Sequence, residues 1–283
     1  MHAARRLAYN ARLERNARRV APALTEHESN KPAKSTADEV FGIDALDKLL
    51  EEGVLKGYAR MDLALSAAGV FIVIMWGCFV LFRVTSIPFL FEDYRNIVEN
   101  QALHRLATIS EGWNDDSIRP LTALSFALDW ALGDGAPASF HATSAFIHVL
   151  NSALIFLLCR NLFDRGRVSE VTCLAPALLF MIHPAASTSA LYISDRGVLL
   201  GAFFALLTVL LYLGRPGNDL RAEPHGGNLA LALATFTAGW ASHSALWALP
   251  LVLVSADLAI VRRVRWARIA PLAFLAAAFV VVR

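Results

Sequence analysis

Long runs of apolar residues recur along the chain from residue 63 onward, and they are separated by a long loop at 83–138 and by shorter polar segments after it. Runs of this kind predict helices that cross a lipid bilayer or pack inside a membrane domain. They cover residues 63–82, 139–159, 171–182, 198–213, 229–240, 246–260 and 269–282. We therefore predict an all-α, polytopic membrane protein with about seven transmembrane helices.

The second apolar run carries a polar stripe. Its members, His141, Ser144, His148 and Asn151, are spaced by three, four and three residues and so share one helix face. Such a stripe should face protein or a cavity and not lipid. It either joins helices through hydrogen bonds or lines a substrate or cofactor cavity. A third interpretation is that the imidazole of His148 binds a haem or pigment metal.

The residues before the first apolar run have a different character. Residues 1–34 form a basic arm with six arginines, which either lies on anionic lipid or a partner protein, or is a solvated tail. Residues 35–60 predict an amphipathic surface helix, because Thr36 and Glu39 fit a capping box and apolar residues follow at helical spacing. We expect this helix to dock on the membrane surface or on other membrane protein subunits.

Composition supports the membrane assignment. Of the 283 residues, 56% are hydrophobic and only 18% are charged, which excludes an ordinary soluble domain. The net charge of +2 gives no reason to expect a nucleic-acid partner. The three cysteines lie in apolar runs without the spacing of metal ligands, so no metal site is predicted.

The distribution of arginine predicts the orientation of the spans. With a cytoplasmic N-terminus, every internal loop is rich in arginine, whereas the short external turns hold only Arg196. The internal arginines are Arg160, Arg165, Arg167, Arg215, Arg221, Arg262, Arg263, Arg265 and Arg268. We therefore predict a transmembrane domain at 61–283 with an external loop at 83–138.

This orientation brings several polar residues to the external face. Glu92 and Asp93 lie in the external loop, and either carboxylate could take a proton from an acceptor hydroxyl. Arg119, Arg196 and His243 are candidates for binding a lipid phosphate, because guanidinium groups match phosphate oxygens. Each residue also has an ordinary structural interpretation, as a loop acid, an interface anchor or a helix end.

Five motifs resemble the membrane-embedded GT-C glycosyltransferases, nearest the transmembrane O-mannosyltransferases with tetratricopeptide tails and their bacterial relatives. They are FEDYRNIVEN, RPLTALSF, FHATSAFIHVLNSAL, HPAASTSALYISDR and ASHSALWALPLVLVSADL, and together they cover about residues 88–260. The resemblance implies transfer of a sugar from a polyprenyl-phosphate donor to a protein hydroxyl on the external face, with the acidic pair as base or as metal and acceptor contact. We expect the protein to lie in a bacterial inner membrane, with its N-terminus in the cytoplasm.

The sequence departs from the family pattern at charged positions. The family usually has two aspartates where this chain has Glu92 and Asp93, a glutamate where it has Thr188, and Lys-Glu where it has His243 and Ser244. We therefore expect a truncated, degenerate and non-catalytic relative without a cofactor. It would serve as an accessory subunit of a larger membrane complex, for which an energy-converting assembly is a natural candidate. The alternative is an active transferase that uses a polyprenyl-phosphate sugar donor, with or without a divalent metal.

Overall fold

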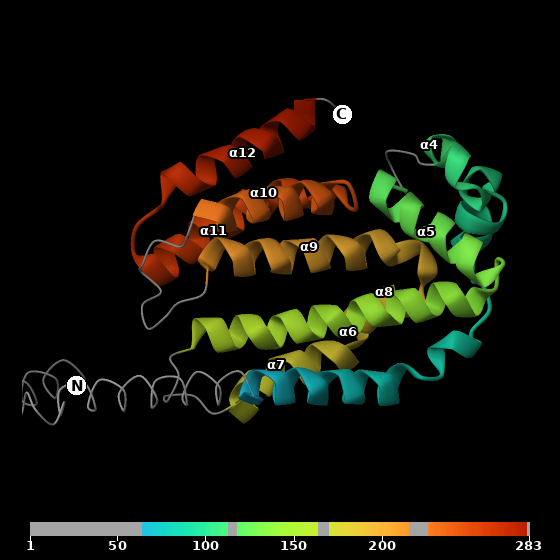
Figure 1. Cartoon of the computed structure of the whole chain (residues 1–283), viewed down its shortest axis with the longest axis horizontal. Coiled ribbons are helices and arrows are strands. Elements are labelled where there is room, and N and C mark those ends of the chain that lie inside the picture. The colour runs from blue at the N-terminus through green and yellow to red at the C-terminus, as the bar shows by residue number, and fades with distance from the viewer. Residues whose placement is uncertain (1–63, 113–117, 164–169, 215–225, 282–283) are drawn as a thin grey trace, which may run out of the picture. The chain divides into compact units, whose positions relative to one another are not determined.

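The computed structural model describes residues 64–112, 118–163, 170–214 and 226–281. The predicted arm at 1–34 and the predicted surface helix at 35–60 lie outside these ranges. Within them the regular elements are helices, with no β-strand (Figure 1). The prediction of an all-α membrane protein is confirmed for the described part of the chain.

Each of the seven predicted segments contains a helix. The first helix covers residues 64–81. The others are α6 (Pro137–Leu162), α7 (Glu170–Ile182), α9 (Arg196–Leu213), α10 (Gly226–Trp240), α11 (Leu249–Ala256) and α12 (Trp266–Val281). Shorter elements are α4 (Ile109–Gly112), α5 (Pro120–Gly133), α8 (Pro184–Leu191) and the turns η1 (Val84–Ser86), η2 (Tyr94–Val98), η3 (Gln101–His104), η4 (Leu106–Thr108), η5 (Ile193–Asp195), η6 (Ser244–Ala248) and η7 (Asp257–Val261).

The described residues contain four helices that are long and apolar enough to cross a membrane. These are Ala64–Ser86, Pro137–Leu162, Ile193–Leu213 and Ser244–Val261. The pair α7 and α8 adds a fifth if it counts as one span, with a bend of 53° between its halves. The helix α12 is apolar but shorter. The count of seven spans therefore stays a prediction.

Proline sets where several of these helices begin. α5, α6 and α8 each have a proline in the first turn, at Pro120, Pro137 and Pro184. A proline there loses no hydrogen bond, because the first N–H groups of a helix have no intrahelical partner. Pro184 also separates α7 from α8, since the residue before a proline is driven out of the helical region, and His183 has an extended backbone.

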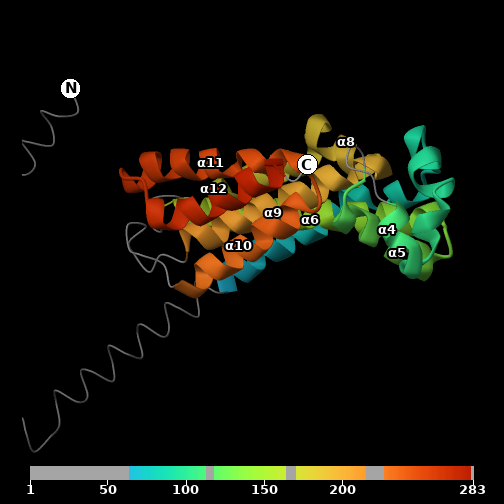
Figure 2. The same cartoon turned by 90° about the horizontal axis from the view of Figure 1, so that it is seen from above.

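The described helices pack through four apolar clusters, the smallest of which joins α6, α8 and α9. α6 packs against the first helix and α7 around Val73, Phe156 and Met181. On its other side α6 contacts α9, which lies between α6 and α10 (Figures 1 and 2). A second cluster joins α9 and α10 to α11 and α12, and a third packs the loop after η1 against α5 and the start of α6.

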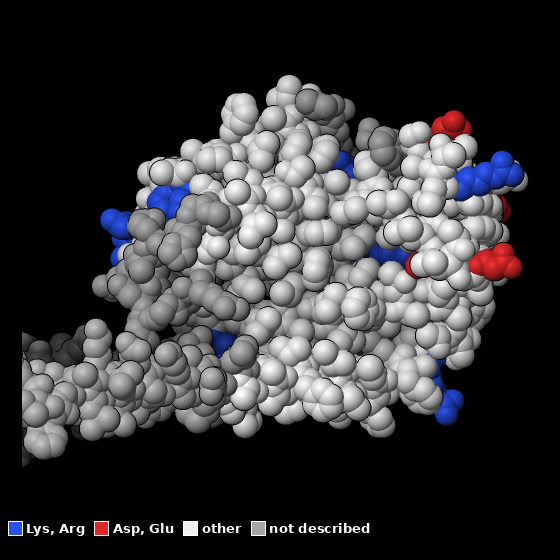
Figure 3. All heavy atoms as spheres, viewed as in Figure 1, with Lys and Arg blue, Asp and Glu red and all other residues white. Residues whose placement is uncertain are grey.

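Charged residues gather at the two ends of the helices. On the face in Figure 3, both signs appear at the end formed by α5 and the preceding loop, whereas the coloured atoms at the opposite end are all blue and belong to arginines. The band between them is mostly uncharged. Arg262 and Arg263 are exposed at the end with positive charge, and Glu99 and Glu111 are exposed at the other. This arrangement suits a protein that spans a bilayer.

Candidate functional site

The two neighbouring acids of the predicted site have different environments. Asp93 is fully buried, and its Oδ1 accepts hydrogen bonds from the backbone N and the Oγ of Ser194, at 2.8 and 2.7 Å. Its Oδ2 accepts a third hydrogen bond from the backbone N of Leu90, at 3.0 Å. The carboxylate of Asp93 thus holds the loop between the first helix and α5 against the turn before α9.

Glu92, which precedes Asp93 in the chain, is exposed. Its backbone N donates to the hydroxyl of Tyr192 at 3.2 Å. Desolvation raises the pKa of Tyr192, and the nearby carboxylates of Glu92, Asp93 and Asp195 raise it further. Glu92 is therefore the member of the acidic pair whose side chain can meet a solute at this end of the protein.

Arg119 and His243 meet at the start of α5. Leu121 N donates to the backbone oxygen of Ala241 at 2.9 Å, which docks this start on the turn between α10 and η6. The guanidinium of Arg119 lies over the ring of Trp240, 4.6 Å from its centroid. Burial lowers the pKa of His243, the charge of Arg119 lowers it further, and the carboxylate of Asp195 opposes them.

The ring of His243 also caps the turn that follows it. Its Nδ1 accepts a hydrogen bond from the backbone N of Ala245 at 3.2 Å. Gly201 on α9 makes room for this arrangement, since a Cβ atom there would lie 2.8 Å from the Cβ of His243. The position where the sequence resemblance implies a lysine therefore holds a half-buried imidazole that accepts a hydrogen bond.

Arg196 is completely enclosed. Its guanidinium forms an ion pair with Asp129 at 2.5 Å and donates to the backbone oxygen of Phe140 at 2.6 Å. It also donates to the hydroxyls of Ser144 and Ser125, at 3.1 and 3.4 Å. Because these acceptors surround a side chain with no exposed surface, the arrangement does not fit the hypothesis that Arg196 binds a lipid phosphate.

Arg119 and Arg196 lie at different places along α5. Arg119 stands at the start of α5, whereas Arg196 contacts Ser125 and Asp129 farther along the same helix. Asp129 lies ten residues after Arg119, which is about 15 Å at the rise of an α-helix. Of the two arginines predicted to bind a lipid phosphate, Arg119 thus lies at an end of α5 and Arg196 lies against its buried face.

The polar stripe of α6 is buried along its whole length. Ser144 accepts from Arg196, His148 Nε2 bonds the backbone oxygen of Met181 at 3.1 Å, and Asn151 Nδ2 donates to the backbone oxygen of Leu199 at 3.1 Å. These contacts join α6 to α7 and α9. His141 is also buried, and its ring lies beside the backbone of Ile87 and Pro88. Helix–helix adhesion therefore accounts for three of the four positions.

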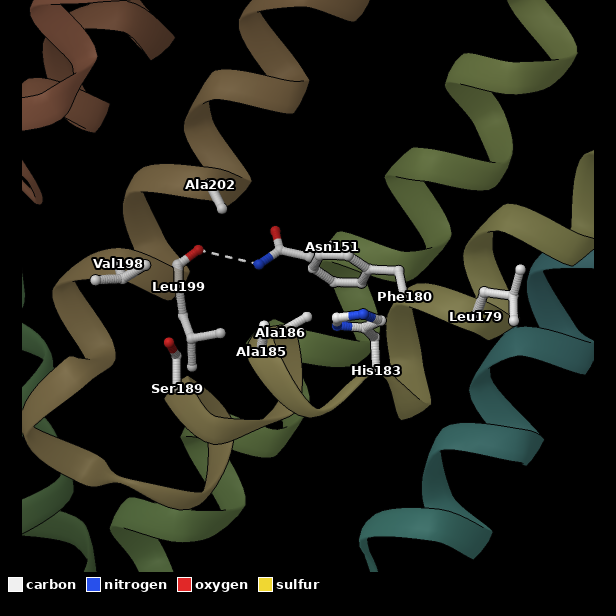
Figure 4. Close-up of a pocket in the computed structure, with 10 residues that line it drawn as sticks. All are labelled: Asn151, Leu179, Phe180, His183, Ala185, Ala186, Ser189, Val198, Leu199 and Ala202. Atoms are coloured by element: carbon white, nitrogen blue, oxygen red, sulfur yellow. Dashed lines mark hydrogen bonds between the residues drawn. The ribbon is translucent and has the colours of Figure 1, made fainter.

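Asn151 has a second environment, because it also lines a cavity of about 420 Å³ between α6, α7, α8 and α9 (Figure 4). The remaining lining is mostly apolar and includes Leu179, Val198 and Leu199, with His183 also present. The cavity is separate from Glu92 and Asp93, neither of which lines it. The interpretation of the stripe as part of a cavity thus holds for its last member.

In the described ranges no three His, Cys, Asp or Glu residues are grouped so as to hold a metal ion.

Two residues that are decisive for the structure, Asp129 and Ser194, were not identified as such from the sequence. A carboxylate within the apolar stretch of α5 was a usable signal, because buried acids are usually paired. Ser194 gave no such signal, since a serine in a polar turn is common.

The fold and this arrangement define an all-α membrane protein, and the comparisons with known proteins relate it to GT-C-like membrane glycosyltransferases. The chain is similar to the protein O-mannosyl-transferase TMTC3 of Mus musculus, with 29% identity over 144 residues, which are 46% of this chain and 15% of that protein. It is 30% identical over 171 residues to the protein O-mannosyl-transferase TMTC4 of Homo sapiens, covering 52% of this chain and 23% of the relative. A third relative, Tmtc1 of Drosophila melanogaster, is 32% identical over 96 residues, or 34% of this chain and 11% of its own length.

These O-mannosyltransferases are GT-C-like, so the resemblance inferred from the five motifs is confirmed. The chain spans less than a quarter of the length of these relatives. No family model matches the chain. No solved structure matches it significantly.

Proposed function

We propose that this chain is a GT-C-derived membrane protein that does not transfer sugar and that acts as an accessory subunit of a larger membrane complex. The observation that carries the proposal is that two charged residues of the sequence motifs, Arg196 and Asp93, are buried and make their contacts inside the protein. Arg196 is enclosed by Asp129, Phe140 and Ser144, and Asp93 is enclosed by Leu90 and Ser194. Side chains whose polar atoms are hydrogen-bonded to buried protein groups hold elements together and are not available to a substrate.

The departures from the family pattern support the same conclusion. Thr188 stands at the position of a usual glutamate, and its hydroxyl donates to the backbone oxygen of Pro184 at 2.7 Å. His243 stands at the position of a usual lysine, and it caps η6. Loss of one preorganised charged contact typically costs about 2.7–4 kcal/mol of transition-state stabilisation. Two such losses remove most of the rate of a transferase that relied on them.

Partner binding is assigned to the N-terminal segments. The basic arm at 1–34 offers positive charge, and the helix predicted at 35–60 would offer one apolar stripe. An amphipathic helix needs lipid or protein against its apolar face. We place both segments on the cytoplasmic side of a bacterial inner membrane, where they would bind neighbouring membrane subunits and anionic lipid.

Co-purification in mild detergent tests this proposal. The full chain should elute with stoichiometric membrane partners, and deletion of residues 1–60 should release it while the helices stay folded. The matched control is replacement of the six arginines by glutamine, which keeps the length of the arm. If the full chain elutes without partners in every detergent tested, the accessory role loses its support.

A second candidate function is sugar transfer with Glu92 as the base. It is favoured by the exposure of Glu92 and by the names of the relatives. In that reaction the carboxylate takes the proton of an acceptor hydroxyl, the oxygen bonds to the sugar, and polyprenyl phosphate leaves. The test is transfer from a polyprenyl-phosphate mannose by the purified chain. Transfer that Glu92→Gln abolishes would replace the first proposal by this one.

A further inference from the structure

The turn between η7 and α12 concentrates positive charge at the arginine-rich end of the helices. Residues 249–281 contain four arginines and one acid. Of the arginines, Arg262 and Arg263 are exposed and the other two are buried. On the face in Figure 3, the coloured atoms at this end are all blue. Exposed guanidinium groups on adjacent residues are complementary to an anion, and to phosphate oxygens in particular.

Asp257 fixes the backbone of this turn from two directions. Its backbone oxygen accepts a hydrogen bond from Arg262 N at 2.9 Å, and its buried carboxylate accepts one from Arg265 N at 2.8 Å. The carboxylate also accepts from Arg265 Nε and from the hydroxyl of Tyr212, at 2.9 and 2.7 Å. Arg262 and Arg263 thus stand on a turn that is already ordered, which lowers the entropy lost when they bind a ligand.

The conformation of Arg262 gives a separate indication of function. Its φ is 65°, in the left-handed region where η7 ends and where glycine is usually favoured. Within the described part of the chain, its exposed guanidinium makes no hydrogen bond or ion pair. A strained position occupied by a side chain with no internal contact of this kind is a candidate for binding something outside the protein.

The flanking helices place this turn at the surface of a bilayer. The candidate span Ser244–Val261 ends one residue before Arg262. The apolar helix α12 begins at Trp266, so the segment 262–265 is all that separates the two apolar helices. The head-group region extends about 5–7 Å beyond the hydrocarbon on each side, which an extended arginine side chain can reach. The anion that these arginines meet at this depth is the phosphate of a lipid.

Trp266 supports the same depth. Its side chain is 65% exposed, although it begins an apolar helix. Tryptophan is enriched at membrane–water boundaries, because its ring is largely apolar and its N–H group is polar. An exposed indole next to two exposed arginines therefore favours a lipid as the partner over an acidic protein or a soluble anion.

We propose that this turn binds the head-group phosphate of an anionic phospholipid through Arg262 and Arg263, with Trp266 against the glycerol region of the same lipid. The excess of arginine favours an anionic lipid over a zwitterionic one, whose ammonium group the turn repels. The proposal requires neither sugar transfer nor an accessory role. It concerns a site within the folded helices and does not depend on the N-terminal arm.

Photo-crosslinking of the full chain in phosphatidylcholine vesicles tests the proposal. The probe is phosphatidylglycerol with a diazirine in its head group, and the readout is the share of labelling that falls on the peptide 257–268 by mass spectrometry. Unlabelled phosphatidylglycerol should compete at least about fivefold better than added phosphatidylcholine, the factor expected for one arginine near an anionic surface. Inorganic phosphate should not compete, because it lacks the glycerol and acyl chains that hold the lipid beside Trp266.

Two matched double variants complete the experiment. Arg262→Gln with Arg263→Gln should lower the labelling of 257–268 by about tenfold or more, since each arginine contributes roughly fivefold. Arg95→Gln with Arg105→Gln makes the same change at two exposed arginines near α5, and it should leave this labelling unchanged. All four substituted side chains are exposed, so both variants should fold, and circular dichroism confirms it.

Four results would overturn the proposal. Equal competition by phosphatidylcholine would show that the turn does not recognise an anionic lipid, and strong competition by inorganic phosphate would show a site for a soluble anion. Labelling unchanged in the Arg262 and Arg263 variant would show that lipid lies near the turn without binding these arginines. Equal losses in the two double variants would show a general effect on the protein. A loss confined to the first variant, together with the preference for phosphatidylglycerol, supports the proposal.

Discussion

Ser194 donates two hydrogen bonds to a single carboxylate oxygen of Asp93, although the residues are 101 positions apart. Because of this contact, the neighbouring acids Glu92 and Asp93 have different roles, although the sequence alone does not distinguish them. Asp93 is fully buried and structural, whereas its neighbour Glu92 is exposed. Adjacent residues of a helix point in different directions, and here it is Asp93 whose carboxylate contacts Ser194 of η5.

The first prediction separates these two roles. Asp93→Ala should lower the free energy of unfolding by about 1–3 kcal/mol, because two donors of Ser194 lose their acceptor. Glu92→Ala should change it by less than about 0.5 kcal/mol, as is usual for an exposed side chain. Chemical unfolding in detergent gives both values, and hydrogen exchange at the amide of Ser194 should accelerate only in the first variant. Equal effects of the two substitutions would contradict the division of roles.

The second prediction concerns the buried pair of Arg196 and Asp129. Arg196→Met leaves the carboxylate of Asp129 buried without its partner, which should cost about 3–5 kcal/mol. The double variant with Asp129→Leu should recover much of this loss, because neither charge then remains. A double-mutant cycle from unfolding curves measures the coupling. Additive losses in the double variant would show that the pair is not coupled.

Much of the helical framework follows from the sequence. The seven predicted segments all contain helices, because apolar runs and prolines in first turns are local signals. The spacing of His141, Ser144, His148 and Asn151 correctly predicted one buried face, since helical periodicity fixes which residues share a face.

The partners of the site residues could not be predicted in the same way. Arg196 looked like an external phosphate ligand because it follows a polar turn, but it points into a cluster formed by Asp129 and Phe140. That contact depends on how α5 packs against α6 and α9, and a single sequence carries no record of such packing. The number of spans also stayed open, because α7, α10 and α12 are short and the break at His183 can divide one span or end it.

The third prediction is a pH dependence at His243. The pKa of this imidazole in the folded protein is below its ordinary value of 6.5. Below about pH 6.5 the unfolded chain therefore binds a proton that the folded chain does not, so stability falls as the pH decreases from there toward the folded pKa. Above pH 6.5 this contribution is constant. Protonation also removes the lone pair of Nδ1 that accepts from Ala245 N.

His243→Asn provides the matched comparison for this effect. An asparagine oxygen can accept the same hydrogen bond from Ala245 N, and it does not titrate. The difference in unfolding temperature between the wild type and this variant should be small and constant above pH 7, and it should shift in favour of the variant as the pH falls below 6.5. A difference that stays constant down to pH 5 would contradict a depressed pKa at His243.

The fourth prediction is the orientation of the helices in the membrane. Glu99 is exposed at the end of the helices that holds α5, and Arg263 is exposed at the opposite, arginine-rich end. The positive-inside rule places Arg263 in the cytoplasm and Glu99 outside. In a chain whose Cys78, Cys159 and Cys173 are replaced by alanine, Glu99→Cys should react with a membrane-impermeable maleimide on intact cells. Arg263→Cys should react only after the membrane is opened. Reversed labelling of the two positions would invert the orientation, and it would move Glu92, Arg119 and His243 to the cytoplasmic face.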